Sequence, residues 1–142
     1  NGVDIISRNG VTIQGGLTIN SKSYGDYKVL WQGASAMGKD SSISLSEPVS
    51  SQTHGIMLVF SLGNSYEGIC SFFKSRAEVA LMSGGAHTFL MASNPTLSSF
   101  GVKCLYINDG TINGHSGNTG SGTGSGITYS NNGYVLRYII GL

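Results

Sequence analysis

The feature that most constrains this sequence is its C-terminal stretch, which ends on an apolar strand pattern. Two β-favouring runs surround the turn residues Asn131-Asn132-Gly133, and we predict that they form the last hairpin. In the second run, Tyr134–Leu142, alternate positions on both faces are mostly apolar, and Arg137 is the one charged residue. A strand of this kind needs cover on both sides. We therefore expect a closing strand inside a sheet, with apolar surface that neighbouring chains cover.

Runs of alternating or continuous apolar residues recur along the middle of the chain. The regular spacing is typical of a sandwich, in which strands follow one another at intervals of about 8–12 residues. Arg76–Met82 could also form a helix, but it spans less than two turns without a good cap, so we predict a strand there. The predicted strands are Tyr27–Gln32, Ile43–Ser46, Gly55–Leu62, Gly68–Phe73, Ala77–Leu81, His87–Ala92 and Val102–Ile107.

These patterns predict an all-β fold, with an antiparallel, jelly-roll-like β-sandwich head at residues 23–142. A chain of 142 residues has room for one such domain. Residues 1–22 are predicted to form a short β stem or neck, because Val11–Ile13 and Leu17–Ile19 are very short runs next to Asn-Gly and Gly-Gly turns. Strands this short are stable only when they stack on copies of themselves or on other chains.

Composition excludes several classes of partner. The net charge is +1 without a basic run, which argues against nucleic acid and against a membrane surface as partners. No stretch approaches the about 18 apolar residues of a membrane-spanning helix, so we expect no membrane insertion. Cys70 and Cys104 lie in apolar runs, and we predict buried free thiols rather than a disulfide. Asn1 replaces an initiator Met, so we expect further chain before it.

Catalytic and metal-binding motifs are not evident, and we predict no catalytic residue, metal or cofactor. The histidines His54, His87 and His115 lack the local spacing of zinc sites. The Asn108–His115 stretch lacks the acidic pattern of a calcium loop and is more simply a turn. Glu67 and Glu78 flank a predicted strand and are the acids on which a hydrolase alternative would depend.

Saccharide binding is the chemistry that the remaining residues favour. Tyrosines outnumber phenylalanines, and amphipathic rings beside Asn, Asp and Ser suit the apolar faces and hydroxyls of a sugar, although buried rings more often serve the core. Asn108–Gly126 is predicted to be one long Gly/Ser-rich loop, either a flexible linker or a functional loop. The candidate saccharide-binding residues are Asn108, Asp109, Asn113, His115, Asn118, Tyr66 and Trp31.

Several segments resemble viral fibre proteins. Val11–Asn20 resembles the short stem units that precede receptor-binding heads in trimeric bacteriophage tail fibres. Lys28–Gly33, His54–Ser61 and the closing Gly124–Leu142 look like C-terminal head domains of tail fibre or baseplate proteins from phages that infect Gram-positive bacteria. The resemblance covers most of the chain, and it assigns no binding site residue by residue.

The resemblance implies a homotrimeric, non-enzymatic receptor-binding protein at the tail tip or baseplate of a virion, outside the cell. Its expected partners are host cell-wall polysaccharide or teichoic acid, other tail or baseplate proteins, and two further copies of itself around a threefold axis. Repetition of weak sugar sites would raise avidity. Two alternatives remain open, namely a polysaccharide depolymerase on a similar fibre and a structural capping domain without a ligand.

Overall fold

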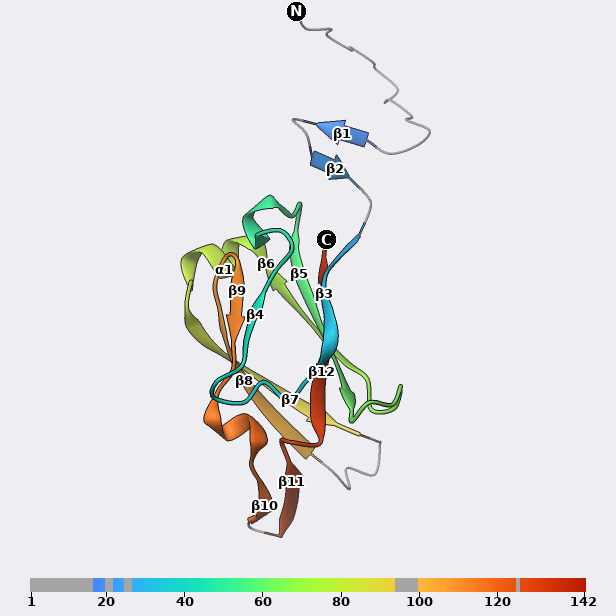
Figure 1. Ribbon diagram of the computed structural model, residues 1–142, viewed down its shortest axis with the longest axis vertical. Coiled ribbons are helices and arrows are strands. Elements are labelled where there is room, and N and C mark those ends of the chain that lie inside the picture. Colours follow the sequence, from blue (N-terminus) through green and yellow to red (C-terminus); the bar gives the residue numbers. More distant parts are fainter. Residues whose placement is uncertain (1–16, 20–21, 25–26, 94–99, 125) are drawn as a thin grey trace, which may run out of the picture.

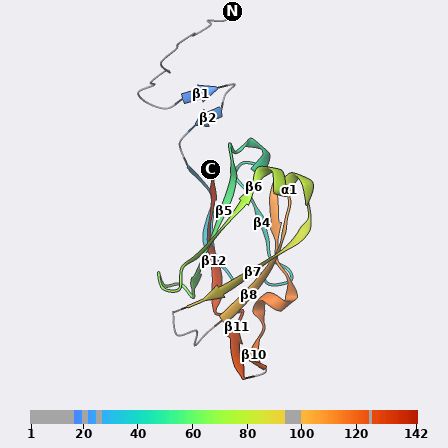
Figure 2. The ribbon, with the colours of Figure 1, turned by 180° about the vertical axis from the view of Figure 1, so that it is seen from behind.

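The computed structural model describes residues 17–19, 22–24, 27–93, 100–124 and 126–142. Two sheets, one of four strands and one of six, pack face to face, so the predicted all-β sandwich is confirmed (Figures 1 and 2). The first elements are β1 (Leu17–Ile19), β2 (Lys22–Tyr24), β3 (Lys28–Ser35), β4 (Ser42–Ser44), the 3₁₀ helix η1 (Val49–Ser51), β5 (Gly55–Leu62) and β6 (Cys70–Ser75). They are followed by α1 (Arg76–Leu81), β7 (Gly85–Ala92), β8 (Phe100–Ile107), β9 (Thr111–Asn113), η2 (Ser116–Thr119), β10 (Ser121–Gly124), β11 (Ile127–Ser130) and β12 (Tyr134–Gly141).

The four-stranded sheet has the order β3-β12-β5-β6, with β12 between two antiparallel neighbours. Leu136 and Ile139 of β12 are buried against the second sheet, as the apolar pattern of the C-terminal run predicts. The prediction that β11 and β12 form a hairpin is wrong, because β11 pairs with β10 and β8 in the other sheet. The Asn131-Asn132-Gly133 turn therefore carries the chain from one layer of the sandwich to the other.

The six-stranded sheet is organised around β8. Strand β7 pairs with β8 over its whole length, whereas the opposite edge of β8 is shared by β11 near Phe100 and by β9 near Ile107. The β8–β11 pairing is parallel, and every other strand pair is antiparallel among the residues that the structure describes. Within the described ranges, this edge of β8 has no neighbouring strand between β11 and β9, and the side chains of Asn118 and Asn131 bond to it there.

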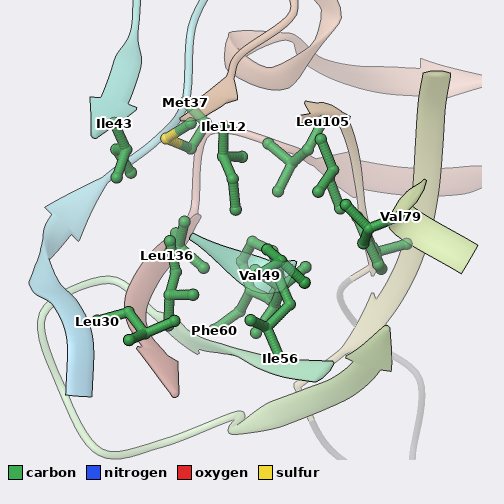
Figure 3. Packing of buried hydrophobic residues seen from close by; sticks show 14 of the residues in the cluster. Leu30, Met37, Ile43, Val49, Ile56, Phe60, Val79, Leu105, Ile112 and Leu136 are labelled. Atoms are coloured by element: carbon green, nitrogen blue, oxygen red, sulfur yellow. The ribbon is translucent and has the colours of Figure 1, made fainter. Parts of the chain in front are cut away.

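Aliphatic and aromatic side chains fill the space between the two sheets (Figure 3). Phe60, Phe72 and Phe89 form a ring cluster with centroids 5.0–6.0 Å apart, which are edge-to-face and tilted arrangements. Gly101 of β8 is close to the buried ring of Tyr134 on β12, where a Cβ would lie 2.3 Å from a ring carbon. The absence of a side chain at Gly101 therefore lets the two layers meet.

Residues Arg76–Leu81 form the helix α1, so the prediction of a strand at Ala77–Leu81 is wrong. Ser75 caps the helix, since its side chain accepts a hydrogen bond from the backbone N–H of Glu78. Glu78 at the third helical position completes the Ser-X-X-Glu pattern of a capping box. Val79 is buried in the core, which anchors this short helix over the end of the sandwich.

The segment predicted as one long loop, Asn108–Gly126, contains three regular elements instead. These are β9, η2 and β10, so this prediction is also wrong. Glycine supplies tight turns between short elements here rather than a flexible linker. The first part of the segment packs on η1, and the last part forms a hairpin with β11 at the opposite end of the molecule (Figures 1 and 2).

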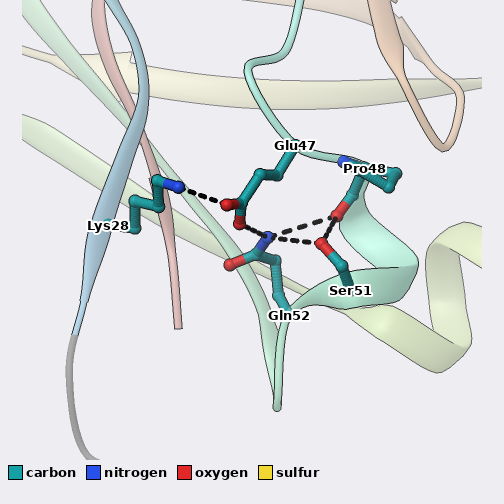
Figure 4. A network of polar contacts seen from close by, with 5 residues as sticks. All are labelled: Lys28, Glu47, Pro48, Ser51 and Gln52. Carbon is teal, nitrogen blue, oxygen red and sulfur yellow. Dashed lines mark hydrogen bonds and ion pairs between the residues drawn. The ribbon is translucent and has the colours of Figure 1, made fainter. Parts of the chain in front are cut away.

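The C-terminus and the start of β3 lie at the same end of the four-stranded sheet, where Gly141 pairs with Lys28. Backbone hydrogen bonds between Leu142 and the start of β5 hold the last residue in place. Beside them, Lys28 forms an ion pair with Glu47, and the Gln52 side chain donates to Glu47, Ser51 and the Pro48 carbonyl (Figure 4). The pKa of Glu47 is lowered, first by the Lys28 hydrogen bond and then by Gln52.

Strands β1 and β2 form an antiparallel hairpin, with β1 inside the predicted stem and β2 running from its last residue, Lys22, into the predicted head. The other predicted stem strand, Val11–Ile13, lies outside the described residues. Cys70 and Cys104 are free thiols, as predicted, but each is half-buried rather than buried. The Sγ atom of Cys70 is 3.7 Å from the carbonyl oxygens of Gly68 and Ala92.

Candidate saccharide-binding surface

The candidate binding residues do not form one cluster. Asn108 and Asp109 lie in the β8–β9 turn against η1, whereas Asn113, His115 and Asn118 lie in and around η2. Tyr66 lies in the β5–β6 loop and Trp31 on β3, both outside the six-stranded sheet. The predicted saccharide-binding residues therefore lie at separate places on the molecule rather than on one surface.

Asp109 is used by the fold itself. Its carboxylate accepts hydrogen bonds from the backbone N–H of Ser50, at 2.7 Å, and from the Ser50 hydroxyl, at 2.8 Å. Its carbonyl accepts the N–H of Val49, so the β8–β9 turn holds the start of η1. Asn108 closes the same turn, because its backbone N–H donates to the Thr111 carbonyl.

Asn118 completes the edge of β8. Its side chain is buried, and its Oδ1 accepts the N–H of Cys104 at 2.7 Å while its Nδ2 donates to the Cys104 carbonyl at 2.8 Å. The amide thus makes the pair of bonds that a neighbouring strand would make, in the gap between β9 and β11. Asn131 makes one such bond two residues earlier on β8, since its Oδ1 accepts the N–H of Val102, while its Nδ2 donates to the Gly117 carbonyl.

Lys103 is a buried residue of β8 that bonds to Asn118 from the interior of the sandwich. Its side chain is buried, and its Nζ donates to the carbonyls of Ala36 and Asn118, each at 2.8 Å. The Nδ2 of Asn118 also donates to the Met37 carbonyl, so both residues hold the β3–β4 connection against η2. Burial lowers the pKa of Lys103 to about 8.

The remaining candidates in this region are partly accessible. His115 precedes η2 and caps it, because its Nδ1 accepts the N–H of Gly117 at 3.0 Å, and its half-buried ring lies 6.0 Å from that of Tyr106. The Oδ1 of Asn113 accepts the Ser42 hydroxyl across the β4–β9 pair. Both side chains therefore already have partners within the chain.

The two aromatic candidates have different environments. Tyr66 is 78% exposed, and its ring lies 6.0 Å from the guanidinium of Arg137. Trp31 is half-buried, packs against the core and lies over Gly33, where a Cβ would approach the indole to 2.5 Å. Trp31 pairs with Ile139 and packs on the core, whereas Tyr66 lies in an exposed loop over Arg137, so the two rings have different surroundings.

A surface that the sequence prediction missed lies on the β10–β11 hairpin. Tyr129 of β11 pairs with Gly122, and a Cβ at Gly122 would lie 3.1 Å from the Tyr129 hydroxyl oxygen and 3.3 Å from two ring carbons. The ring therefore lies flat against the hairpin, with 39% of the residue exposed. The hydroxyls of Thr123 and Thr128 pair across the strands at 3.3 Å. The signal in the sequence that could have indicated this surface is the Gly122-Thr123-Gly124 run a few residues before Tyr129.

The acids and histidines that the structure describes lie at separate places in the fold, apart from the pair His87 and Glu78. Glu67 lies in the loop before β6 and Glu78 lies in α1 after it, so the two acids flank the two ends of this strand. Glu78 is ion-paired with Lys74 at 2.8 Å. Among the described residues, no three His, Cys, Asp or Glu side chains form a group that could hold a metal ion.

His87 is the one buried histidine among the described residues. Its Nδ1 lies 3.6 Å from the Glu78 carboxylate, and its Nε2 has no hydrogen-bond partner in the described part of the chain. Its pKa is lowered, mainly by burial and further by Lys74. The pKa of Glu78 is also lowered, first by the Lys74 hydrogen bond at 2.8 Å. This group is a structural contact between α1 and β7.

No protein-family model matches this chain, and no curated protein sequence matches it either. In the described residues, no helix combines the length and the apolarity that crossing a bilayer requires.

Proposed function

We propose that this chain is the host-binding head of a bacteriophage tail fibre or baseplate protein, which attaches the virion to a host cell-surface saccharide such as wall polysaccharide or teichoic acid. The observation that carries the proposal is the Tyr129 ring, laid flat on a hairpin at the end of the sandwich opposite the start of β3 and the C-terminus (Figure 1). A carrier attached through the stem would leave this hairpin pointing outwards.

The hairpin offers suitable chemistry for a sugar. The free face of Tyr129 can stack on the apolar face of a pyranose ring. One such platform binds weakly. Three copies in a homotrimer, repeated over the virion, would raise the avidity without any new contact.

A structural capping domain without a ligand is the second candidate. It is favoured by the partners of Asp109, Asn113, His115 and Asn118, each of which bonds within the fold. Small polar residues used in this way build turns and sheet edges rather than a binding surface.

The test replaces Tyr129 with alanine and compares it with Tyr27→Ala, which removes a tyrosine that is 71% exposed next to the start of β3. Binding to purified Gram-positive cell walls and to a glycan array is measured. We expect Tyr129→Ala to weaken binding about tenfold, since ring contacts are worth about 0.5–1.5 kcal/mol beyond their buried area, and Tyr27→Ala to leave it unchanged. Equal binding by both variants would refute the hairpin as the site.

Wild-type chain that binds none of the walls or glycans would favour the capping domain. Release of new reducing ends from wall polysaccharide by the wild-type chain would instead support the depolymerase alternative. Both readouts use the same purified protein.

A further inference from the structure

We infer that the outer face of the four-stranded sheet is the surface on which a second copy of this chain packs, an inference that rests on the homotrimer in the proposed function. This outer face is defined by two rows of paired residues that cross all four strands. The first row is Val29, Ile140, Met57 and Phe73, and the second is Gln32, Tyr138, Val59 and Ser71.

The direction of these side chains follows from alternation along each strand. Ile56, Leu58 and Phe60 of β5 are fully buried in the core, so Met57 and Val59 between them point to the other side of the sheet. An antiparallel sheet with one face in water normally carries polar residues on that face. Here the first row is wholly apolar, and neither row contains a charged residue.

Exposure of the rim confirms that the described part of the chain leaves this outer face open. Phe73 at one edge is 51% exposed and Val29 at the other is 42% exposed, while Met57 and Ile140 between them are half-buried. In Figures 1 and 2, the second sheet lies on the opposite side of β12 and β5. Contiguous apolar surface of this kind marks an interaction site.

The size of the outer face suits a second copy. Strands lie about 4.8 Å apart and rise about 3.3 Å per residue, so the whole outer side of the sheet, which extends beyond the two rows over strands of six to eight residues, covers roughly 500 Å². Two copies in contact would bury roughly 1,000 Å², which is where specific interfaces begin. Because only 11% of the residues are charged, a second copy can cover this face without burying unpaired ions.

The first test uses Phe73→Lys, with Leu90→Lys as its matched control. Leu90 is 65% exposed on β7 in the six-stranded sheet, so both lysines enter exposed positions that a single chain tolerates. Sedimentation equilibrium at micromolar concentration is expected to show an assembled wild type and an assembled Leu90→Lys variant. Phe73→Lys should weaken association at least tenfold, because a buried charge is introduced into the interface. A wild-type monomer, or a fully assembled Phe73→Lys variant, would overturn the inference.

A second test reads the surface directly and does not depend on a disruptive variant. Ser71 and Thr88 are both exposed in the single chain, on the outer faces of the two different sheets. In the assembled protein, the Ser71→Cys thiol should react with a bulky maleimide at least tenfold more slowly than the Thr88→Cys thiol. Equal rates would place the interface elsewhere.

The two proposals fail separately. A monomeric chain that still binds cell walls would refute this interface and leave the host-binding function intact. A chain that assembles through the outer face but binds no wall or glycan would refute the host-binding function and leave the interface standing.

Discussion

At the scale of single residues, the most unusual group is Lys103, a primary amine in the interior of an all-β domain. Its two acceptors are backbone carbonyls on separate segments, those of Ala36 and Asn118. Within the described part of the chain no carboxylate is bonded to it, so burial acts on the charged form without compensation from an opposite charge, and the pKa falls to about 8. The amine acts as a cross-link between the β3–β4 connection and η2.

This lowered pKa predicts a stability that rises with pH. Between pH 8 and 10.5 the unfolded chain holds a proton at Lys103 that the folded chain has released, so raising the pH favours the folded state. Because each pKa unit is worth about 1.36 kcal/mol, the gain over this window is about 3 kcal/mol. Urea unfolding at several pH values measures it. Lys103→Met should lose the rise, whereas the exposed Lys39→Met should keep it.

A direct titration separates this effect from other groups that ionise in the same range. The ¹³C shift of the Lys103 Cε atom should titrate with a midpoint near 8. A midpoint at the ordinary lysine value would contradict the prediction.

At the scale of elements, α1 depends on the residue that precedes it, Ser75, more than on its helix propensity. A helix of six residues is marginal by itself, and Ser75 supplies the cap that satisfies the Glu78 N–H. Because Glu78 is three residues after Ser75, its carboxylate turns back towards the Ser75 backbone. This contact contributes to the lowered pKa of Glu78, after the larger effect of Lys74. The cap therefore fixes both α1 and the ion pair beside it.

Removing this cap should destabilise the domain measurably. Ser75→Ala is expected to lower the free energy of unfolding by about 1 kcal/mol, and Ser75→Asp should retain most of it, because aspartate also accepts the N–H bond. Ser83→Ala is the control, since this exposed serine follows the helix. Thermal and urea unfolding give the comparison. Equal losses for Ser75→Ala and Ser83→Ala would show that the cap contributes nothing.

Elements also show where sequence reasoning succeeds and fails. Long runs such as Gly55–Leu62 and Tyr134–Leu142 are predicted as strands because they are apolar on both faces. The structure confirms them as β5 and β12. The α1 prediction failed because the Ser75-X-X-Glu78 cap was not recognised. Pairing of β11 with β8 depends on contacts distant in sequence, which no local pattern encodes.

The candidate site was harder to predict for a physical reason. Asn and Asp have the same side-chain donors and acceptors whether they bind a sugar or a backbone amide, so composition does not separate the two uses. Asn118 mimics a strand edge, and Asp109 holds a 3₁₀ helix. The Tyr129 platform becomes visible only through its pairing with Gly122.

At the scale of the whole molecule, the two layers approach closely where Gly101 meets the Tyr134 ring. Gly101→Ala is expected to lower stability by about 1–3 kcal/mol, because the added methyl group overpacks the interior. Gly124→Ala is the matched control, since a Cβ there meets nothing within 4 Å. Differential scanning calorimetry compares their transition temperatures. A neutral Gly101→Ala substitution would mean that the layers can separate without cost.

The β10–β11 hairpin joins the rest of the sandwich by one short parallel contact and by the side chain of Asn131, rather than by a continuous ladder. Its sequence can therefore change with little effect on the core that supports it. If the proposed host-binding function holds, substitutions in this hairpin could change the saccharide that is bound while the supporting sandwich stays the same.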